Sequence, residues 1–348
     1  MTIKDLAAQT GYSVGTVSRV LNNQPHVSLQ ARESILRAAE ESGFQLNANA
    51  QQLKQQHGSA IIAICKGAGN ELFNSLLVAL QSRIDQTEYP LVVDYIDENE
   101  NEVRRALRLC REKKPRGILF LGGNQENFRR DFHLIHQPCV LVTSSAEQLP
   151  FQNLSSVTSD DALAGRLAVE HLAALGHTKI VVIGGQRNIS DTTALRYSGC
   201  QDAFCRYGIA FDDERDYETC RFTFEGGFQA AQALLERNRE FTALFAMSDV
   251  MAIGAIRALR DAGKRVPEDV SVMGLDGLDM GQYTLPRLST VAQSVETLAQ
   301  ESLTLLCQAI ENGAPARHKT IPVTVLEKES VASLAQEGVA ADKHMETL

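Results

Sequence analysis

The chain has 348 residues, a formal net charge of −9 and an apolar content of 44%. At about 150 residues per domain, this length predicts two or three folded units, each large enough to bury a core. The acidic balance argues against a protein that coats nucleic acid over its whole surface. The sequence has no apolar run of the roughly 18 residues that span a bilayer and no apolar stretch typical of a secretory signal, so we expect a cytoplasmic protein.

The cysteines and short motifs give no sign of a metal or a cofactor. Seven cysteines are scattered along the chain, and no two of them form a CxxC pair. This pattern favours buried, reduced thiols over a disulfide framework or a zinc site. The sequence also lacks the phosphate-loop, nucleophile-elbow and zinc-protease signatures. We therefore expect no metal, no cofactor and no catalytic residue.

The N-terminal segment differs in charge from the rest. Residues 1–57 contain five basic and four acidic side chains, a net charge of +1, which leaves −10 for the remainder. A nearly neutral segment on an acidic protein permits local contact with DNA, although a basic segment would be stronger support.

Three short helices are predicted in this segment. Apolar spacing indicates a helix over Ile3–Thr10 that ends at Gly11, and Ser13 can cap a second helix that runs to Asn22. Ser28 caps a third helix, which ends at Gly43. Two short helices about a glycine turn predict a helix-turn-helix, although such a pair also occurs in ordinary helical domains.

The second of these helices carries side chains suited to DNA. Its hydroxyl groups at Ser13, Thr16 and Ser18 suit phosphate oxygens, which set the register of a protein on DNA. Arg19 can donate to the O6 and N7 atoms of a guanine, and Val14 can contact a thymine methyl group. Gly15 offers little direct readout.

From Gly58 onward the pattern alternates between strand and helix. This alternation predicts parallel sheets with helices on both faces, and the length predicts two lobes. The expected helices include 70–84, 162–175, 228–237 and 250–262. The expected strands are 60–65, 91–96, 117–121, 140–143, 180–183, 243–246, 270–274 and 321–326.

Several strings resemble the lactose-repressor/galactose-repressor (LacI/GalR) family of transcriptional regulators. In the N-terminal segment these are TIKDLA, TVSRVLNN and HVSLQAR. In the body they are SDDALAGRLAVEHLAALGHTKIVVIGG, ALRYSG, FAMSDVMAIGAIRAL, VPEDVSVMGLDG and LPRLSTV. The resemblance implies a repressor that binds a pseudo-palindromic operator as a homodimer and is switched by a small molecule, most often a sugar.

The resemblance also implies a domain plan. The helix-turn-helix domain would cover 1–45, a hinge helix 46–58 and an effector-binding and dimerisation domain 59–332, with a flexible tail over 333–348. The effector domain would have the Rossmann-like, periplasmic-binding-protein fold. Lobe 1 would cover about 59–159 and 291–321, and lobe 2 about 160–290 and 322–332.

Further DNA-binding positions follow from the resemblance. Leu53 of the hinge matches the side chain that the family inserts into the central base step, where it kinks the DNA. Leu46 stands where the family often has proline, a departure that weakens the start of the hinge. Besides the residues already named, the implied DNA-binding residues are Asn22, His26, Asn47, Ala50 and Leu53.

The resemblance places an effector site between the lobes. Arg196 and Asp276 match the family's two polar anchors, which suit sugar hydroxyl groups. Phe222 matches a stacking aromatic and Phe73 a wall of the first lobe. The implied small polar contacts are Ser190, Thr192 and Ser248, with Asp249 expected to cap the following helix and Thr143 and Asp160 as weaker candidates.

Two other function classes stay open at this point. A cytosolic α/β enzyme would use Asp160 or Asp276 as a general base, and a solute-binding protein would require a signal peptide. We favour the repressor. We expect a dimer, because the tail from Ser333 lacks the sustained leucine heptads of a tetramer. The sequence does not decide whether the effector induces or corepresses.

Overall fold

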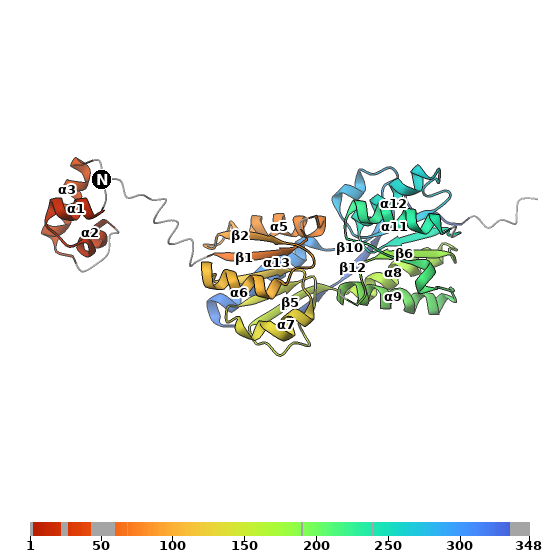
Figure 1. Cartoon of the computed structure of the whole chain (residues 1–348), viewed down its shortest axis with the longest axis horizontal. Coiled ribbons are helices and arrows are strands. Elements are labelled where there is room, and N and C mark those ends of the chain that lie inside the picture. The colour runs from red at the N-terminus through yellow and green to blue at the C-terminus, as the bar shows by residue number, and fades with distance from the viewer. Residues whose placement is uncertain are drawn as a thin grey trace, which may run out of the picture. The chain divides into compact units, whose positions relative to one another are not determined.

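The chain divides into two units (Figure 1). The first ends at Ser59 and the second begins at Ala60. The computed structural model describes residues 3–21, 27–42, 60–67, 69–188, 191–237 and 240–334. Within these ranges, no helix is both long and apolar enough to cross a membrane.

The first unit is a three-helix domain. Its helices are α1 (Ile3–Thr10), α2 (Val14–Leu21) and α3 (Leu29–Glu41). One apolar residue from each helix, Leu6, Val17 and Ile35, is fully buried in a shared core. The turn between α1 and α2 depends on Gly11, whose positive φ of 73° suits glycine. The predicted helix-turn-helix is present.

The first lobe of the second unit is built on a six-stranded parallel sheet in the order β11-β5-β4-β3-β1-β2. Successive residues of β1 point to opposite faces of the sheet. Because the residues from Ile61 to Cys65 are all buried, both faces of the sheet are covered. Helices α5 (Glu71–Ile84) and α13 (Val295–Asn312) cover one face, and α6 (Glu102–Lys113) and α7 (Gln125–Asp131) cover the other. The strands are β1 (Ile61–Lys66), β2 (Leu91–Ile96), β3 (Gly117–Leu121), β4 (Cys139–Val142), β5 (Leu154–Ser159) and β11 (His318–Ile321).

The second lobe repeats this architecture with the strand order β12-β10-β9-β8-β6-β7. All its strand pairs are parallel except β10 with β12. Helices α8 (Asp161–Ala174) and α9 (Asp191–Tyr207) cover one face, and α11 (Phe224–Glu236) and α12 (Asp249–Asp261) cover the other. The strands are β6 (Ile180–Gly184), β7 (Tyr217–Thr219), β8 (Ala243–Ala246), β9 (Ser271–Asp276), β10 (Ser289–Gln293) and β12 (Val323–Leu326).

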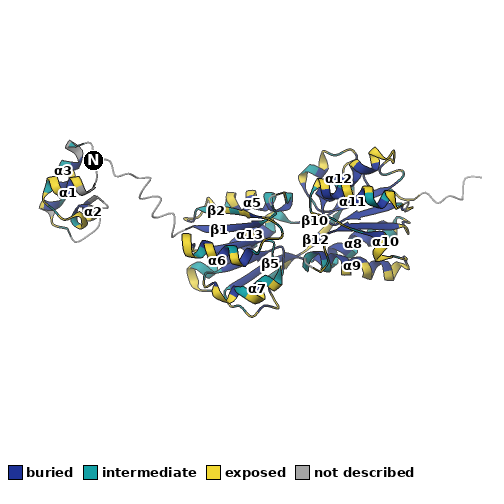
Figure 2. Cartoon of the chain, viewed as in Figure 1, coloured by how far each residue is buried: buried dark blue, intermediate teal, exposed yellow. Residues whose placement is uncertain are grey.

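Figure 2 shows the buried strands of both lobes between helices whose outer faces are exposed. The predicted two-lobed α/β fold is therefore confirmed. The chain passes between the lobes three times: after β5, between β10 and α13, and at Pro322 between β11 and β12. β10 continues in the second sheet to Gln293, beyond the change of lobe expected after residue 290.

Sequence patterning missed three strands. β5 and β10 read LSSVTS and STVAQ, in which small polar residues interrupt the apolar run, and β7 has only three residues. The single strand expected over 321–326 is two strands in different sheets. Pro322 separates them, and its missing N–H suits the point where pairing changes.

Glycines set the close crossing of α8 and α9. A Cβ atom on Gly165 would lie 1.9 Å from the carbonyl oxygen of Arg196, and one on Gly199 would lie 1.9 Å from that of Ala162. A side chain at either position would force the helices apart. The crossing therefore fixes the backbone from which Arg196 projects.

Candidate functional site

A cavity of about 810 Å³ lies between the two lobes of the second unit. Its walls come from segments that follow β1, β2, β3 and β4 of the first lobe and β6, β7 and β9 of the second. Open α/β sheets bind ligands at these carboxyl ends of strands. The volume falls in the range of pockets that enclose small organic molecules.

Arg196 is held rigidly at the cavity wall. It lies in α9 and is only 3% exposed. Its Nε donates to Oδ1 of Asp161 at 2.8 Å, and its Nη1 donates to the carbonyl oxygen of Met247 at 2.6 Å. Two anchored nitrogens fix the plane of the guanidinium group, so its position does not depend on a ligand.

Asp276 ends β9 and lines the same cavity. It is 4% exposed and accepts a hydrogen bond from Nε2 of Gln293 at 2.8 Å. Its φ of 132° is unusual for a residue with a Cβ atom, and such strain is often retained at functional sites. The pKa of Asp276 lies above its ordinary value, mainly because the group is buried. The nearby Arg196 guanidinium opposes this shift, and the Asp249 carboxylate adds to it.

Ser248 and Asp249 do not have the roles expected from the sequence. Ser248 is 2% exposed and its hydroxyl oxygen accepts from the backbone N–H of Met251, so it caps α12 instead of facing the cavity. Asp249, expected to be the cap, accepts from Oγ1 of Thr290 at 2.6 Å and from the backbone N–H of Leu278 at 2.7 Å. This geometry gives no support to a direct contact between Ser248 and an effector.

Two phenylalanines line the cavity from opposite lobes. Phe73 belongs to α5 and Phe222 to the segment before α11. Gly122 and Gly185 make room for them, because a Cβ atom would lie 2.9 Å from Cζ of Phe73 and 2.8 Å from Cε2 of Phe222, respectively. The cavity thus combines apolar ring surfaces with buried hydrogen-bonding groups.

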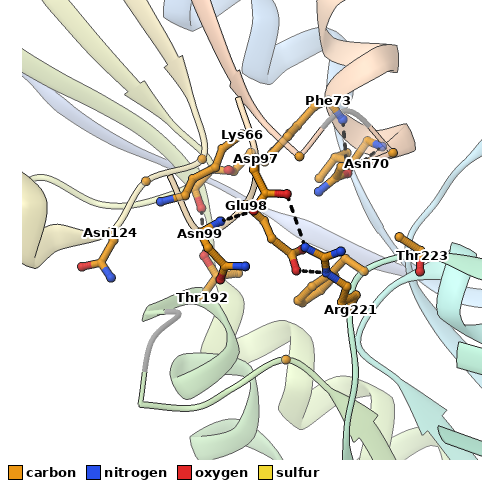
Figure 3. Close-up of a pocket in the computed structure, with 18 of the residues that line it drawn as sticks. Lys66, Asn70, Phe73, Asp97, Glu98, Asn99, Asn124, Thr192, Arg221 and Thr223 are labelled. Carbon is orange, nitrogen blue, oxygen red and sulfur yellow. Dashed lines mark hydrogen bonds and ion pairs between the residues drawn. The ribbon is translucent and has the colours of Figure 1, made fainter. Parts of the chain in front are cut away.

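Hydrogen bonds and ion pairs join the lobes around the cavity. Oγ1 of Thr192, in the second lobe, donates to the carbonyl oxygen of Thr143 in the first at 3.3 Å. Arg221, in the second lobe, pairs with Glu98 and with Asp97, whose Oδ2 lies 3.4 Å from its Nη2 (Figure 3). Sequence analysis missed this cluster, since its residues lie in no motif and are more than a hundred positions apart.

Asp160, a weaker candidate from the sequence, does not line the cavity, whereas Lys66 does. Asp160 caps α8 by accepting from the backbone N–H of Leu163 at 2.9 Å. Lys66 lines the cavity, and its Nζ lies 2.6 Å from Oε2 of the fully buried Glu102. Sequence analysis did not identify Lys66, whose only signal is a charge at the end of an apolar strand.

In the first unit, most of the described residues that the sequence predicts to contact DNA are exposed at the start and along one side of α2. Val17 and Val20 are buried, whereas Val14 and Arg19 are exposed, as are Ser13 and Gly15. The hydroxyl of Ser13 also caps the helix, accepting from the backbone N–H of the half-buried Thr16 at 3.1 Å. Outside the described part of the chain lie the side chain of Ser18 and the residues Asn22, His26, Asn47, Ala50, Leu53 and Ser190.

Comparisons with known proteins agree with both units. The model for bacterial regulatory proteins of the lacI family matches residues 2–47, and the model for periplasmic binding protein-like domains matches residues 169–331. The HTH-type transcriptional regulator MalR of Clostridium butyricum is 30% identical over 333 residues, which cover 95% of this chain and 99% of the relative.

Two solved structures extend the likeness. A lac repressor dimer bound to operator and the anti-inducer ONPF is 27% identical, with a TM-score of 0.74 and coverage of 95% of this chain and 99% of the other. A LacI family regulator of Enterococcus faecium with bound ribose is 25% identical, with a TM-score of 0.68 and coverage of 79% and 99%. The chain belongs to the LacI/GalR family of bacterial transcriptional regulators.

Proposed function

We propose that this regulator represses transcription by binding an operator through its N-terminal unit, and that a sugar bound between the lobes switches it. The observation that carries the proposal is the cleft itself, where the buried Arg196 and Asp276 and the rings of Phe73 and Phe222 line one cavity. The ribose-bound relative supports a sugar as the ligand.

The chemistry of the wall suits a sugar. Arg196 donates N–H groups in a fixed plane, and the carboxyl group of Asp276 accepts from two adjacent hydroxyl groups. The two phenylalanine rings supply apolar surface for the C–H face of a sugar ring. We assign effector binding to these four residues and to Thr192, and we retain Ser190 as a candidate.

A ligand in this cleft contacts both lobes, and this contact makes a switch possible. It changes the balance between two lobe arrangements only by the difference in its affinity for them. A sugar that favours the DNA-binding arrangement acts as a corepressor, and one that favours the other arrangement acts as an inducer. Binding must also be reciprocal, so operator DNA changes the affinity for the sugar by the same factor.

The DNA side of the proposal rests on α2 and on symmetry. Arg19 and Val14 read base edges, while Ser13, Thr16 and Ser18 contact phosphates. We also propose that Asn22, His26 and the hinge residues Asn47, Ala50 and Leu53 contact the operator, with Leu53 as the wedge. A pseudo-palindromic operator matches a two-fold dimer, and we place this DNA-binding regulator in the cytoplasm.

Exposed apolar side chains support self-association. Val78 of α5 is 73% exposed, and Tyr283 and Leu285 of the second lobe are 88% and 77% exposed. Leu278 and Met280, just before that exposed segment, pack in the core cluster that contains α5. We propose that these exposed side chains contribute to the surface that contacts a second copy.

The test begins with selection of binding sites from random duplex DNA by the full-length protein. We expect an inverted repeat to be enriched, and we expect fluorescence anisotropy to show that one or more sugars change its affinity. Arg196→Ala should still bind the site but lose the response. Selection of no inverted repeat would overturn operator binding, and a response only to purines or other non-sugars would overturn the sugar.

A further inference from the structure

The buried cations of the cleft are already paired with carboxylates of the chain. Lys66 lies 2.6 Å from Glu102, and Arg196 lies 2.8 Å from Asp161. Glu102 and Asp161 are themselves 0% and 3% exposed at their side chains, so solvent screens these pairs little. Neither cation is available to neutralise a further negative charge.

The exposed cation of the cleft, Arg221, is also paired with carboxylates. Arg221 pairs with both Glu98 and Asp97, as the dashed lines in Figure 3 show. Lys66, Arg196 and Arg221 are all the cations among the described lining residues. They pair with four carboxylates, so the wall offers no cation in excess.

Helix N-termini are the other common anion sites in such folds. At α5, the backbone N–H groups of Leu72 and Phe73 are capped by Oδ1 of Asn70. At α11, Oγ1 of Thr223 caps the backbone N–H of Gly226. Each helix also begins with a glutamate in its first turn, which opposes a further anion. These two helix ends therefore do not replace the missing cations.

We propose that the cleft selects an uncharged polyhydroxyl ligand and rejects phosphorylated and carboxylated sugars. The inference rests on the proposed sugar-binding function and adds the charge of the sugar. A phosphate ester brings nearly two negative charges and requires unpaired arginine or lysine groups, or a helix N-terminus with open N–H groups. Neutral hydroxyl groups need only donors and acceptors, which Asn99, Gln186 and Thr219 add to the wall.

The test removes the carboxylates that pair with Arg221 and measures whether an anion then binds. In the double variant Asp97→Asn, Glu98→Gln, Arg221 loses its charged partners. The side chains of Asp97 and Glu98 are 61% and 35% exposed, so we expect this variant to fold. The matched control is Asp261→Asn, which releases Arg257 from an exposed pair on α12. The probes are inorganic phosphate and glucose 6-phosphate, with chloride at equal ionic strength as reference, and the readout is the melting temperature.

We expect both probes to raise the melting temperature of the double variant and to leave the natural chain and the control unchanged. Adding Arg221→Ala to the double variant should remove the effect. Stabilisation of the natural chain that disappears in Arg221→Ala would overturn the inference. Equal insensitivity of the natural chain and the double variant would also overturn it, because the carboxylates would then not be what excludes anions. A failure of all sugars to change operator binding would overturn the proposed function without altering this result.

Discussion

Removing Arg196 should destabilise the second lobe by several kilocalories per mole. In Arg196→Met the side chain keeps much of its apolar volume, but Asp161 loses its partner while its side chain is only 3% exposed. Leaving one member of a buried ion pair without its partner costs about 3–5 kcal/mol. We expect a loss of that size in the free energy of unfolding, measured by urea denaturation with circular dichroism.

The double variant Arg196→Met, Asp161→Asn separates the charge from the packing. The double variant has neither charge, so it should recover most of the stability that the single variant loses. Both variants lose the hydrogen bond to the carbonyl of Met247, so that loss does not affect the comparison. The effector response should be absent from both. A single variant that loses less than about 1 kcal/mol, or a double variant no more stable than the single one, would refute the argument from the buried pair.

Three further outcomes test other parts of the molecule. Arg19→Ala should lose about 1–3 kcal/mol of discrimination between the operator and a site with one mutated half, by competition binding; unchanged discrimination would mean that Arg19 reads no base. Burial raises the pKa of Asp276, so the natural chain loses stability as pH rises above the usual aspartate value. Asp276→Asn lacks this loss. The melting temperature of the variant minus that of the natural chain should therefore be higher at about pH 8 than at about pH 5. A difference independent of pH would contradict that reasoning. Gly165→Ala should destabilise the protein by about 1–3 kcal/mol or more and weaken the effector response, since its Cβ atom would meet the carbonyl of Arg196; a neutral substitution would show that α8 and α9 separate freely.

Sequence patterning predicted the layers of the fold well, because buried parallel strands are almost continuously apolar. β3 reads GILFL and is buried throughout, so its existence was evident. β10 contains Ser289 and Thr290, which are also buried but whose polarity hides the strand. Their burial depends on partners far along the chain, such as the hydroxyl of Ser330, which accepts from the backbone N–H of Ser289.

The site was only partly predictable. Arg196, Asp276, Phe73, Phe222 and Thr192 were named from family resemblance, and all five line the cavity. The charge balance of the cleft was not predictable, because it arises from pairs such as Arg221 with Glu98 that only the closed geometry of two lobes brings together. The roles of Ser248 and Asp249 depend on the orientation of adjacent side chains, which the residue types alone do not determine.

The three passages of the chain between the lobes also bear on how the protein is made. The first lobe is interrupted after β5 and is completed only when α13 and β11 are added, after the whole of β6 to β10. At about 5–20 residues per second, the ribosome takes roughly 7–27 s to synthesise the chain from Ser159 to Val295. During that interval α5 covers its face of the first sheet without α13, whose Leu298 and Leu306 are fully buried in the finished protein. The second lobe is also incomplete at that point, because its strand β12 follows β11 in the chain. The nascent chain therefore exposes an apolar face of the first sheet until α13 has been made.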